Sequence, residues 1–241
     1  MRAATKRRRL RAGRRGGAGP IWLFDLDNTL HDATTASYAG INTGMTAFIE
    51  RELGLSREEA DALRRRYWLR YGATLLGLMR HHAVAAAHFL HDVHLLPGLE
   101  SRVRGHGVDI AALARLPGRR VLLTNAPAAY TARVLKALGL ARHFDAVLAI
   151  EDLRMFGHLR PKPDARMYRA LAARLKVPAA RCVLIEDTLA NLKGAHRAGM
   201  QTAWMQRWLK TPSVFRHAPP HRLQHRPAYV KQRMRHLRGL R

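Results

Sequence analysis

The chain has 241 residues, of which 47% are hydrophobic, and this is enough for one buried core with a sizeable insert. The composition excludes a chain that is disordered throughout. Because no run approaches the roughly 18 uninterrupted apolar residues of a membrane helix, we predict a soluble, cytoplasmic protein without a membrane span.

Basic residues gather at the two ends of the chain, whose formal net charge is +26. Residues 1–19 hold eight Lys or Arg, residues 206–241 hold ten, and neither segment holds an acid. The first segment lacks the apolar stretch of about 7–15 residues that a secretory leader needs. We therefore predict a disordered basic arm at 1–19 and a basic tail at 206–241. Either these ends are merely solvated and the start is over-extended, or they contact the phosphate backbone of a nucleic acid.

The first predicted strand covers residues 21–26, where "IWLFDL" is apolar up to its end. Two carboxylates spaced one residue apart, Asp25 and Asp27, stand at that end. Residues 33–116 then separate this strand from the next one, and their pattern is mostly helical. Within them, Ser56 and Glu59 have the spacing of a capping box, which starts a helix.

Three histidines in this helical segment, His88, His91 and His94, recur every three residues. Their number suggests zinc, but the paired ligand motifs of zinc sites are missing. Solvated or hydrogen-bonded histidines are the favoured interpretation.

Strands and helices alternate after the helical segment. Strand-like runs are "RRVLLTN", "DAVLAIE", "RCVLIED" and "QTAWM", and helix-like runs are "AAYTARVLKALGL", "PDARMYRALAARLK" and "LANLKGAHRAG". This alternation predicts an α/β fold with a doubly wound parallel sheet. The single cysteine, Cys182, lies in one of the strands and cannot form an intramolecular disulfide, which favours a reducing compartment.

Polar residues follow several of the predicted strands. Ligands bind at the carboxyl ends of the strands in an open parallel sheet, so we expect these residues to form one site. The set comprises Asp25, Asp27, Thr124, Asn125, Glu186 and Asp187, together with Lys162 in the loop "LRPKPD".

The order of "DLDNT", "LLTN", "PKP" and "IED" resembles the haloacid dehalogenase-like (HAD) hydrolases over about residues 20–205. The resemblance implies a Rossmann-like HAD core at 20–32 and 117–205, with an α-helical cap domain at 33–116. Most members are magnesium-dependent phosphatases. Dehalogenases in the strict sense use no metal and do not need the second acid, so Asp27 makes a phosphatase the better fit.

The paired carboxylates suit phosphoryl chemistry. A phosphomonoester is mostly dianionic at neutral pH, so a carboxylate can attack it only when a cation masks the repulsion. Mg2+ prefers hard oxygen ligands, and the expected ligands are Asp25, the backbone carbonyl of Asp27, Asp187, and Glu186 directly or through water. Asp25 would form an aspartyl phosphate as the nucleophile, while Asp27 would act as general acid and then general base.

The phosphoryl oxygens need donors as their charge changes in the transition state. We expect the hydroxyl of Thr124, the backbone N–H of Asn125 and the charge of Lys162 to supply them.

The helical segment holds the signals for the substrate. Its "YGATLLGL" and the following histidines, with "FDLDNTLHD" and "IEDTLANLKGAHRAGM", resemble the pyrimidine 5′-nucleotidase branch of the family. That resemblance implies a nucleoside monophosphate such as UMP or CMP, with Tyr71, Thr74 and His82 lining the pocket. Tyr71 could instead pack the cap, and Thr74 and His82 could be ordinary helix residues.

Two other functions stay open at this point. A phosphatase of the same mechanism could act on another small metabolite, such as a sugar phosphate or phosphoglycolate. A nucleic-acid-associated protein could use its basic ends, although the set of acids would then have no purpose.

Overall fold

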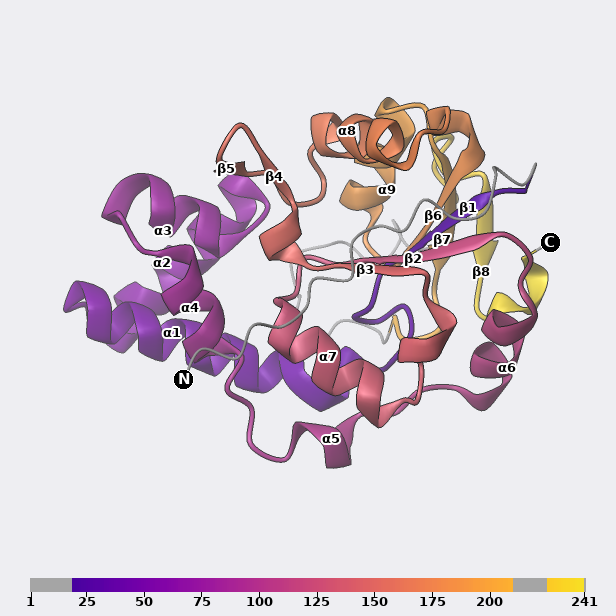
Figure 1. Ribbon diagram of the computed structural model, residues 1–241. Coiled ribbons are helices and arrows are strands. Elements are labelled where there is room, and N and C mark those ends of the chain that lie inside the picture. Colours follow the sequence, from indigo (N-terminus) through magenta and orange to yellow (C-terminus); the bar gives the residue numbers. More distant parts are fainter. Residues whose placement is uncertain (1–18, 210–224, 241) are drawn as a thin grey trace, which may run out of the picture.

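A computed structural model describes residues 19–209 and 225–240 (Figure 1). Its main sheet has six strands in the order β3-β2-β1-β6-β7-β8, and every neighbouring pair is parallel. The strands are β1 Ile21–Phe24, β2 Arg119–Leu123, β3 Ala146–Leu148, β6 Cys182–Glu186, β7 Gln201–Met205 and β8 Gln232–Met234. The predicted doubly wound parallel sheet is confirmed.

The central strands are apolar because both of their faces are covered. All four residues of β1 are buried, and they pair with β2 from Ile21 to Phe24 and with β6 over the same residues. Val147 in β3 lies on the edge strand and is 40% exposed. The chain runs outward from β1 in one direction and returns to β6 on its other side, so β1 and β6 form the switch point of the sheet.

Helices cover both faces of the sheet (Figure 1). On one face, α7 Ala128–Ala137 packs with α5 Leu99–Arg102 and α6 Gly107–Arg115 against Trp22 and Phe24. On the other face, α8 Ala165–Leu175 and α9 Leu189–Arg197 pack against Ile21 and Leu23. The alternation of side chains along β1 thus divides the core into two layers.

The helices α1 Ala39–Leu53, α2 Arg57–Tyr71, α3 Thr74–His82 and α4 Ala86–Val93 have a hydrophobic cluster of their own, which also takes in Ile150 and Leu159. α2 begins at the expected capping box, in which Ser56 and Glu59 bond each other's backbone N–H. The later part of the segment behaves differently, because Leu99 and Leu113 belong to the core cluster that covers the sheet.

Two features were not predicted from the sequence. A short hairpin, β4 Arg154–Met155 with β5 His158–Leu159, stands beside α3 (Figure 1). The strand β8, which lies within the predicted basic tail, extends the sheet next to β7, and Val230 before it is only 1% exposed. The other predictions about the ends, for residues 1–18, 210–224 and 241, lie outside the described residues.

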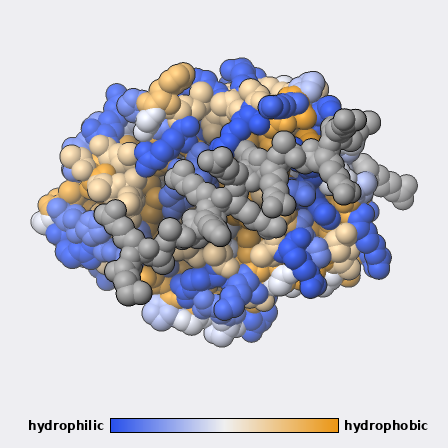
Figure 2. All heavy atoms as spheres, in the orientation of Figure 1, coloured by the Kyte–Doolittle hydropathy of each residue, from blue (hydrophilic) through white to orange (hydrophobic). Residues whose placement is uncertain are grey.

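The surface in Figure 2 mixes hydrophilic and hydrophobic side chains. The large apolar side chains that are exposed are scattered over several elements: Trp68 and Leu69 on α2, Leu95 after α4, Val147 on β3 and Phe156 in the β4–β5 turn. Within the described residues, no helix is long and apolar enough to cross a bilayer.

Candidate active site

The predicted core residues meet at the carboxyl end of the sheet. Asp25 follows β1, Thr124 follows β2, and Glu186 ends β6. Because β1 pairs with β2 on one side and β6 on the other, these three strand ends are neighbours. The backbone N–H of Asp25 continues the ladder by donating to the carbonyl of Ile185 at 3.0 Å.

Lys162 lies between two carboxylates in the middle of this group. Its Nζ is 2.6 Å from Oδ1 of Asp25 and 2.6 Å from Oε2 of Glu186. All three side chains are almost fully buried. Burial acts to lower the pKa of Lys162, but the two carboxylates outweigh it and raise that pKa above its ordinary value. Lys162 is therefore a fixed positive charge at the site.

A third carboxylate makes the group electrically unbalanced. Asp187 lies within 4.8 Å of Asp25 and Glu186, measured between their possible ligand atoms. Burial first, and then the charge of Glu186, raises the pKa of Asp25 to about 7 and also raises the pKa of Asp187. If all three carboxyl groups are ionised, they leave two negative charges without a partner beside one ammonium, and the raised pKa values of Asp25 and Asp187 reflect this repulsion and their burial.

This donor set fits a divalent cation. The three carboxylates offer hard oxygen atoms, which Mg2+ prefers, and two positive charges would balance the excess. Asp25, Glu186 and Asp187 are the residues that would hold the ion. The expected contribution of the backbone carbonyl of Asp27 stays a prediction.

The loop that carries Lys162 is fixed by Asn125 and by α9. The side chain of Asn125 accepts from the backbone N–H of Lys162 at 2.9 Å and donates to its carbonyl at 3.0 Å. Gly194 of α9 lies so close that a Cβ there would be 2.1 Å from the carbonyl oxygen of Pro163. The side chain of Asn125 thus positions Lys162, a role that the sequence analysis did not predict.

Thr124 is buried beside these groups. Its hydroxyl accepts from the backbone N–H of Ala126 at 3.0 Å, while its own N–H donates to Leu148 at 3.0 Å. The hydroxyl proton of Thr124 has no described acceptor, and the backbone N–H of Asn125 has none either. Both lie at the end of β2, and their role as donors to the phosphoryl oxygens stays a prediction.

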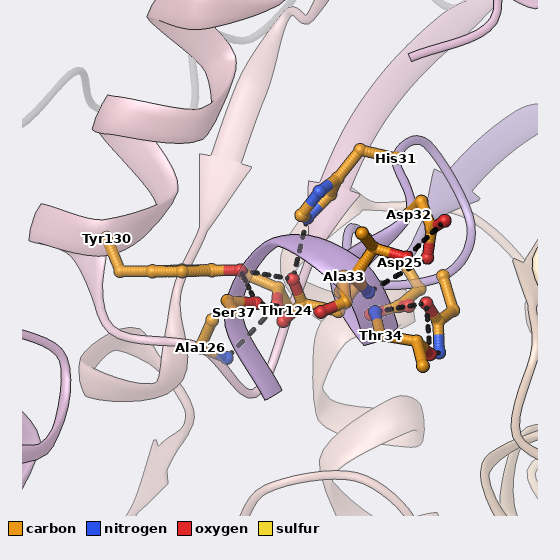
Figure 3. Close-up of polar contacts among 12 residues, drawn as sticks. Asp25, His31, Asp32, Ala33, Thr34, Ser37, Thr124, Ala126 and Tyr130 are labelled. Carbon is orange, nitrogen blue, oxygen red and sulfur yellow. Dashed lines mark hydrogen bonds and ion pairs between the residues drawn. The ribbon is translucent and has the colours of Figure 1, made fainter. Parts of the chain in front are cut away.

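Asp27 stands in a different environment from Asp25, because it bonds His31 and Tyr130, whose side chains point toward one another in Figure 3. Its Oδ1 is 2.8 Å from Nε2 of His31 and accepts from the hydroxyl of Tyr130 at 2.7 Å. Burial favours the neutral acid, but the hydrogen bond and charge of His31 and the bond from Tyr130 outweigh it and lower the pKa of Asp27. Two aspartates that are two residues apart have opposite pKa shifts.

The turn after β1 is held by its own side chains. Asn28 has a left-handed backbone, with φ of 56°, and its side chain bonds both the hydroxyl and the backbone N–H of Thr34. Asp32 accepts from the backbone N–H and hydroxyl of Thr35 in the same way. A π-helix, Thr34–Tyr38 (η1), follows and leads into α1. Such single-turn π-helices are frequent at functional sites.

Four residues around Asp27 were not found by the sequence analysis: His31, Ser37, Tyr38 and Tyr130. Burial first, and then the charges of Asp27 and Asp187, raise the pKa of Tyr38 well above its ordinary value, so its hydroxyl stays protonated near the acids. Tyr130 is also held neutral, by burial and by Asp27. The only sequence signal was their closeness to "DLDNT" and "LLTN".

The predicted substrate residues of the cap bond other cap residues. The hydroxyl of Tyr71 is 2.6 Å from Nε2 of His81, and Nε2 of His82 is 2.7 Å from the hydroxyl of Tyr67. Thr74 is buried and donates to the carbonyl of Arg64 at 3.0 Å, which ties α3 to α2.

The turn between α2 and α3 nevertheless approaches the loop of Lys162. A Cβ on Gly72 would lie 3.5 Å from Cδ of Pro163. Tyr71 is therefore next to the residue at which the cap comes close to the core site.

Two of the three cap histidines lie beside Asp92, and the third has other partners. His88 lies 3.6 Å from Oδ2 of Asp92, and His91 lies 3.4 Å from Oδ1 of the same residue. His94 bonds the carbonyl of Leu90 at 3.0 Å and packs edge-on against Tyr130, with ring centroids 5.5 Å apart. Hydrogen-bonded histidines were the favoured interpretation.

Comparison with known proteins gives a family and a fold. The sequence model of the haloacid dehalogenase-like hydrolases matches residues 21–199. The chain is 24% identical to "Phosphate metabolism protein 8" of Saccharomyces cerevisiae over 194 residues, which are 76% of this chain and 60% of that protein. It thus spans under two thirds of the yeast protein. The chain is 27% identical to "Probable phosphatase IndB" of Dickeya dadantii over 210 residues, covering 83% and 87% of the two chains.

Among solved structures, CbbY from Rhodobacter sphaeroides in complex with phosphate matches with a TM-score of 0.59 and 19% identity. The match covers 92% of this chain and 96% of CbbY. At this identity the likeness supports the fold, including the helical segment that the chain inserts after β1.

Proposed function

We propose that this chain, which belongs to the haloacid dehalogenase-like hydrolases, is a Mg2+-dependent phosphomonoesterase that forms an aspartyl phosphate on Asp25. The observation that carries this proposal is the group of three carboxylates at the end of the sheet, of which Asp25 and Glu186 are buried and bonded to Lys162 and Asp187 is partly exposed. Such a group suits a site that receives a divalent cation and a dianionic phosphoryl group together.

Asp25 is the proposed nucleophile. Lys162 holds its Oδ1, so the carboxylate has a fixed orientation toward the end of the sheet. When bound, Mg2+ would mask the repulsion between this carboxylate and the phosphoryl group. The carboxylate oxygen attacks phosphorus while the bond to the leaving oxygen breaks, and the aspartyl phosphate forms.

Asp27 is the proposed acid and base. The lowered pKa of Asp27 favours its carboxylate, which suits the second step, where it takes a proton from the water that attacks the aspartyl phosphate. In the first step the carboxyl group must take up a proton before it donates one to the leaving oxygen. The hydroxyl of Thr124, the backbone N–H of Asn125 and Lys162 are proposed donors to the phosphoryl oxygens.

The proposed substrate class is a pyrimidine nucleoside 5′-monophosphate such as UMP or CMP. Support comes from the resemblance of the cap sequence and from the approach of the α2–α3 turn to Pro163. We propose that residues 33–116 act as the cap, with Tyr71, Thr74 and His82 near the leaving group. Because Leu96, Leu99 and Leu113 pack with the sheet, the hydrophobic cluster that belongs to the cap ends before Leu96.

A second candidate is a phosphatase for another small metabolite, such as a sugar phosphate or phosphoglycolate. One observation favours this candidate. The side chains of Tyr71, Thr74 and His82 all form hydrogen bonds with other cap residues, so each would have to rearrange before it could bond a nucleobase. Cytoplasmic location, and contact of the basic ends with nucleic acid, stay predictions.

The test is phosphate release from nucleoside monophosphates, sugar phosphates and phosphoglycolate, with Mg2+ and with EDTA. We expect release that needs Mg2+ and is fastest with UMP and CMP. Metal-dependent release from another class would keep the mechanism and discard the nucleotidase assignment. A folded protein that releases phosphate from no compound would contradict the phosphatase proposal.

A further inference from the structure

Both hydrogen bonds to the carboxylate of Asp27 fall on one of its two oxygens (Figure 3). Tyr130 donates to Oδ1 at 2.7 Å, and Nε2 of His31 lies 2.8 Å from the same atom. Oδ2 has no hydrogen-bond partner within the described ranges. The side chain of Asp27 is 17% exposed, so Oδ2 is the oxygen that water or a substrate can reach.

The donor direction at Tyr130 is fixed by its neighbours. The hydroxyl of Tyr130 has one proton, and it goes to Oδ1 because this oxygen can only accept there. The hydroxyl of Ser37 has one proton and two possible acceptors, the hydroxyl of Tyr130 at 2.9 Å and the carbonyl of Ala33 at 3.2 Å, so its donation to Tyr130 is shared with Ala33. A donor that itself accepts a hydrogen bond is polarised and binds its acceptor more strongly. Tyr130 thus links Ser37 and Asp27 in one series of hydrogen bonds.

This series of hydrogen bonds is rigid because Tyr130, Ser37 and His31 are buried on different elements. Tyr130 on α7 is 1% exposed, Ser37 on the π-helix η1 is 3% exposed, and His31 is fully buried. Tyr130 and Asp27 are 103 positions apart in the sequence, so the sheet and α7 set their distance.

We propose that Tyr130 is a positioning residue that holds Asp27 through Oδ1 and thereby reserves Oδ2 for proton transfer. This inference rests on the proposed phosphatase function. In the first step the O–H bond at Oδ2 breaks, and its proton goes to the leaving oxygen as the bond from that oxygen to phosphorus breaks. In the second step water attacks phosphorus, the bond from Asp25 to phosphorus breaks, and the water proton goes to Oδ2.

The arrangement lets one carboxyl group serve both steps without turning. Oδ1 carries no proton in either form of the group, so it accepts from Tyr130 before and after the transfer. Oδ2 alone changes from hydroxyl to oxyanion. General acid catalysis depends on this kind of fixed placement.

The test compares leaving groups in Tyr130→Phe. The leaving group of p-nitrophenyl phosphate departs with little help from an acid, whereas an alkyl phosphate needs a proton. kcat/KM reports phosphoryl transfer to Asp25, the first irreversible step. We expect Tyr130→Phe to lower kcat/KM for the best alkyl phosphate of the wild-type panel by about tenfold to a hundredfold and to lower it much less for p-nitrophenyl phosphate.

Tyr168→Phe is the matched control, because Tyr168 is also a buried tyrosine but donates to the backbone carbonyl of Asn191 on the other face of the sheet. Tyr168→Phe should change kcat/KM by the same factor for the alkyl phosphate and for p-nitrophenyl phosphate. Ser37→Ala removes the donor behind Tyr130 and should show the same leaving-group selectivity as Tyr130→Phe, but smaller; it carries the test if Tyr130→Phe does not fold.

Equal losses on the two substrates, or losses no larger than those of Tyr168→Phe, would overturn the positioning role while leaving the phosphatase proposal intact. A wild-type protein that hydrolyses neither substrate would overturn both.

Discussion

The site at the carboxyl end of the sheet and the α2–α3 helix pair of the cap, called the hairpin below, are organised in opposite ways. At the carboxyl end of the sheet, the exposed fraction is at most 5% for Asp25, Lys162 and Glu186. The bond from Lys162 to Asp25 joins residues that are 137 positions apart. In the hairpin, the bond from Tyr71 to His81 joins residues 10 positions apart, and Trp68 is 49% exposed. One region is assembled by the whole fold, and the other by two neighbouring helices.

The difference separates chemistry from selectivity. The charged side chains at the carboxyl end of the sheet are fixed by strands that also form the core. A change there should therefore disturb the reaction with every substrate. The hairpin keeps its own contacts and approaches the loop of Lys162 where Gly72 lies close to Pro163. A change in the hairpin should therefore affect some substrates and spare others.

The largest effect is expected at Asp25. Asp25→Asn should reduce turnover of every substrate by more than about a thousandfold, because it removes the nucleophile. Stability should not fall. Since the pKa of Asp25 is raised from 3.8 to about 7, ionisation of this carboxyl carries a cost in stability that grows as pH rises between these two values and stays constant above about 7.

Melting temperatures of the wild type and of Asp25→Asn, measured in EDTA, test whether ionisation of Asp25 lowers stability. At pH 8 the variant should melt at the same temperature as the wild type or higher. The difference should shrink below about pH 7, where the wild-type carboxyl takes up a proton. A folded variant with substantial turnover, or one that melts far below the wild type at pH 8, would contradict the comparison.

A pair of glycine substitutions should give an intermediate effect. Gly194→Ala would place a Cβ 2.1 Å from the Pro163 carbonyl, and Gly77→Ala would place one 2.2 Å from the ring of Tyr67. Either change overpacks a helix contact and should cost about 1–3 kcal/mol of unfolding free energy. Only Gly194→Ala displaces the loop of Lys162, so only it should lower kcat for all substrates.

Steady-state kinetics on the substrate panel, with melting curves for both variants, separate the two. If Gly77→Ala lowered kcat uniformly, as Gly194→Ala should, the cap would be part of the catalytic geometry and the proposed division would fail.

The smallest effect is expected at Tyr71. Tyr71→Phe keeps the ring, which Arg70 and Arg80 flank, and removes the hydroxyl that bonds His81. We expect KM for a nucleoside monophosphate to rise by about three- to tenfold, the loss of one hydrogen bond, with KM for p-nitrophenyl phosphate unchanged. An unchanged KM for both would show that Tyr71 only packs the cap.

Much of the core site could be predicted because it follows from strand order. Asp25, Thr124 and Glu186 each end a short apolar strand, and parallel strands bring their carboxyl ends together. Local patterns were sufficient there. The capping box of α2 was equally visible, because both of its members lie within four residues.

The surroundings of Asp27 could not be predicted, because they depend on contacts between distant segments. Nothing in "AAYTARVLKALGL" marks Tyr130 as a partner of Asp27, since only the crossing of α7 over the sheet brings them together. The strand β8 was missed for another reason: "QRM" has two exposed polar residues and lies at the sheet edge, where burial imposes no apolar pattern.

The central claim is that Asp25 becomes phosphorylated during turnover, and trapping tests it most directly. Wild-type protein mixed with Mg2+ and its best substrate is quenched in acid, and intact mass and peptide mapping locate any added phosphoryl group; Asp25→Asn is the control. The account predicts one acid-stable, base-labile phosphoryl group on the peptide that contains Asp25, absent in the variant. Turnover without such a group, or with the group on another residue, would contradict it.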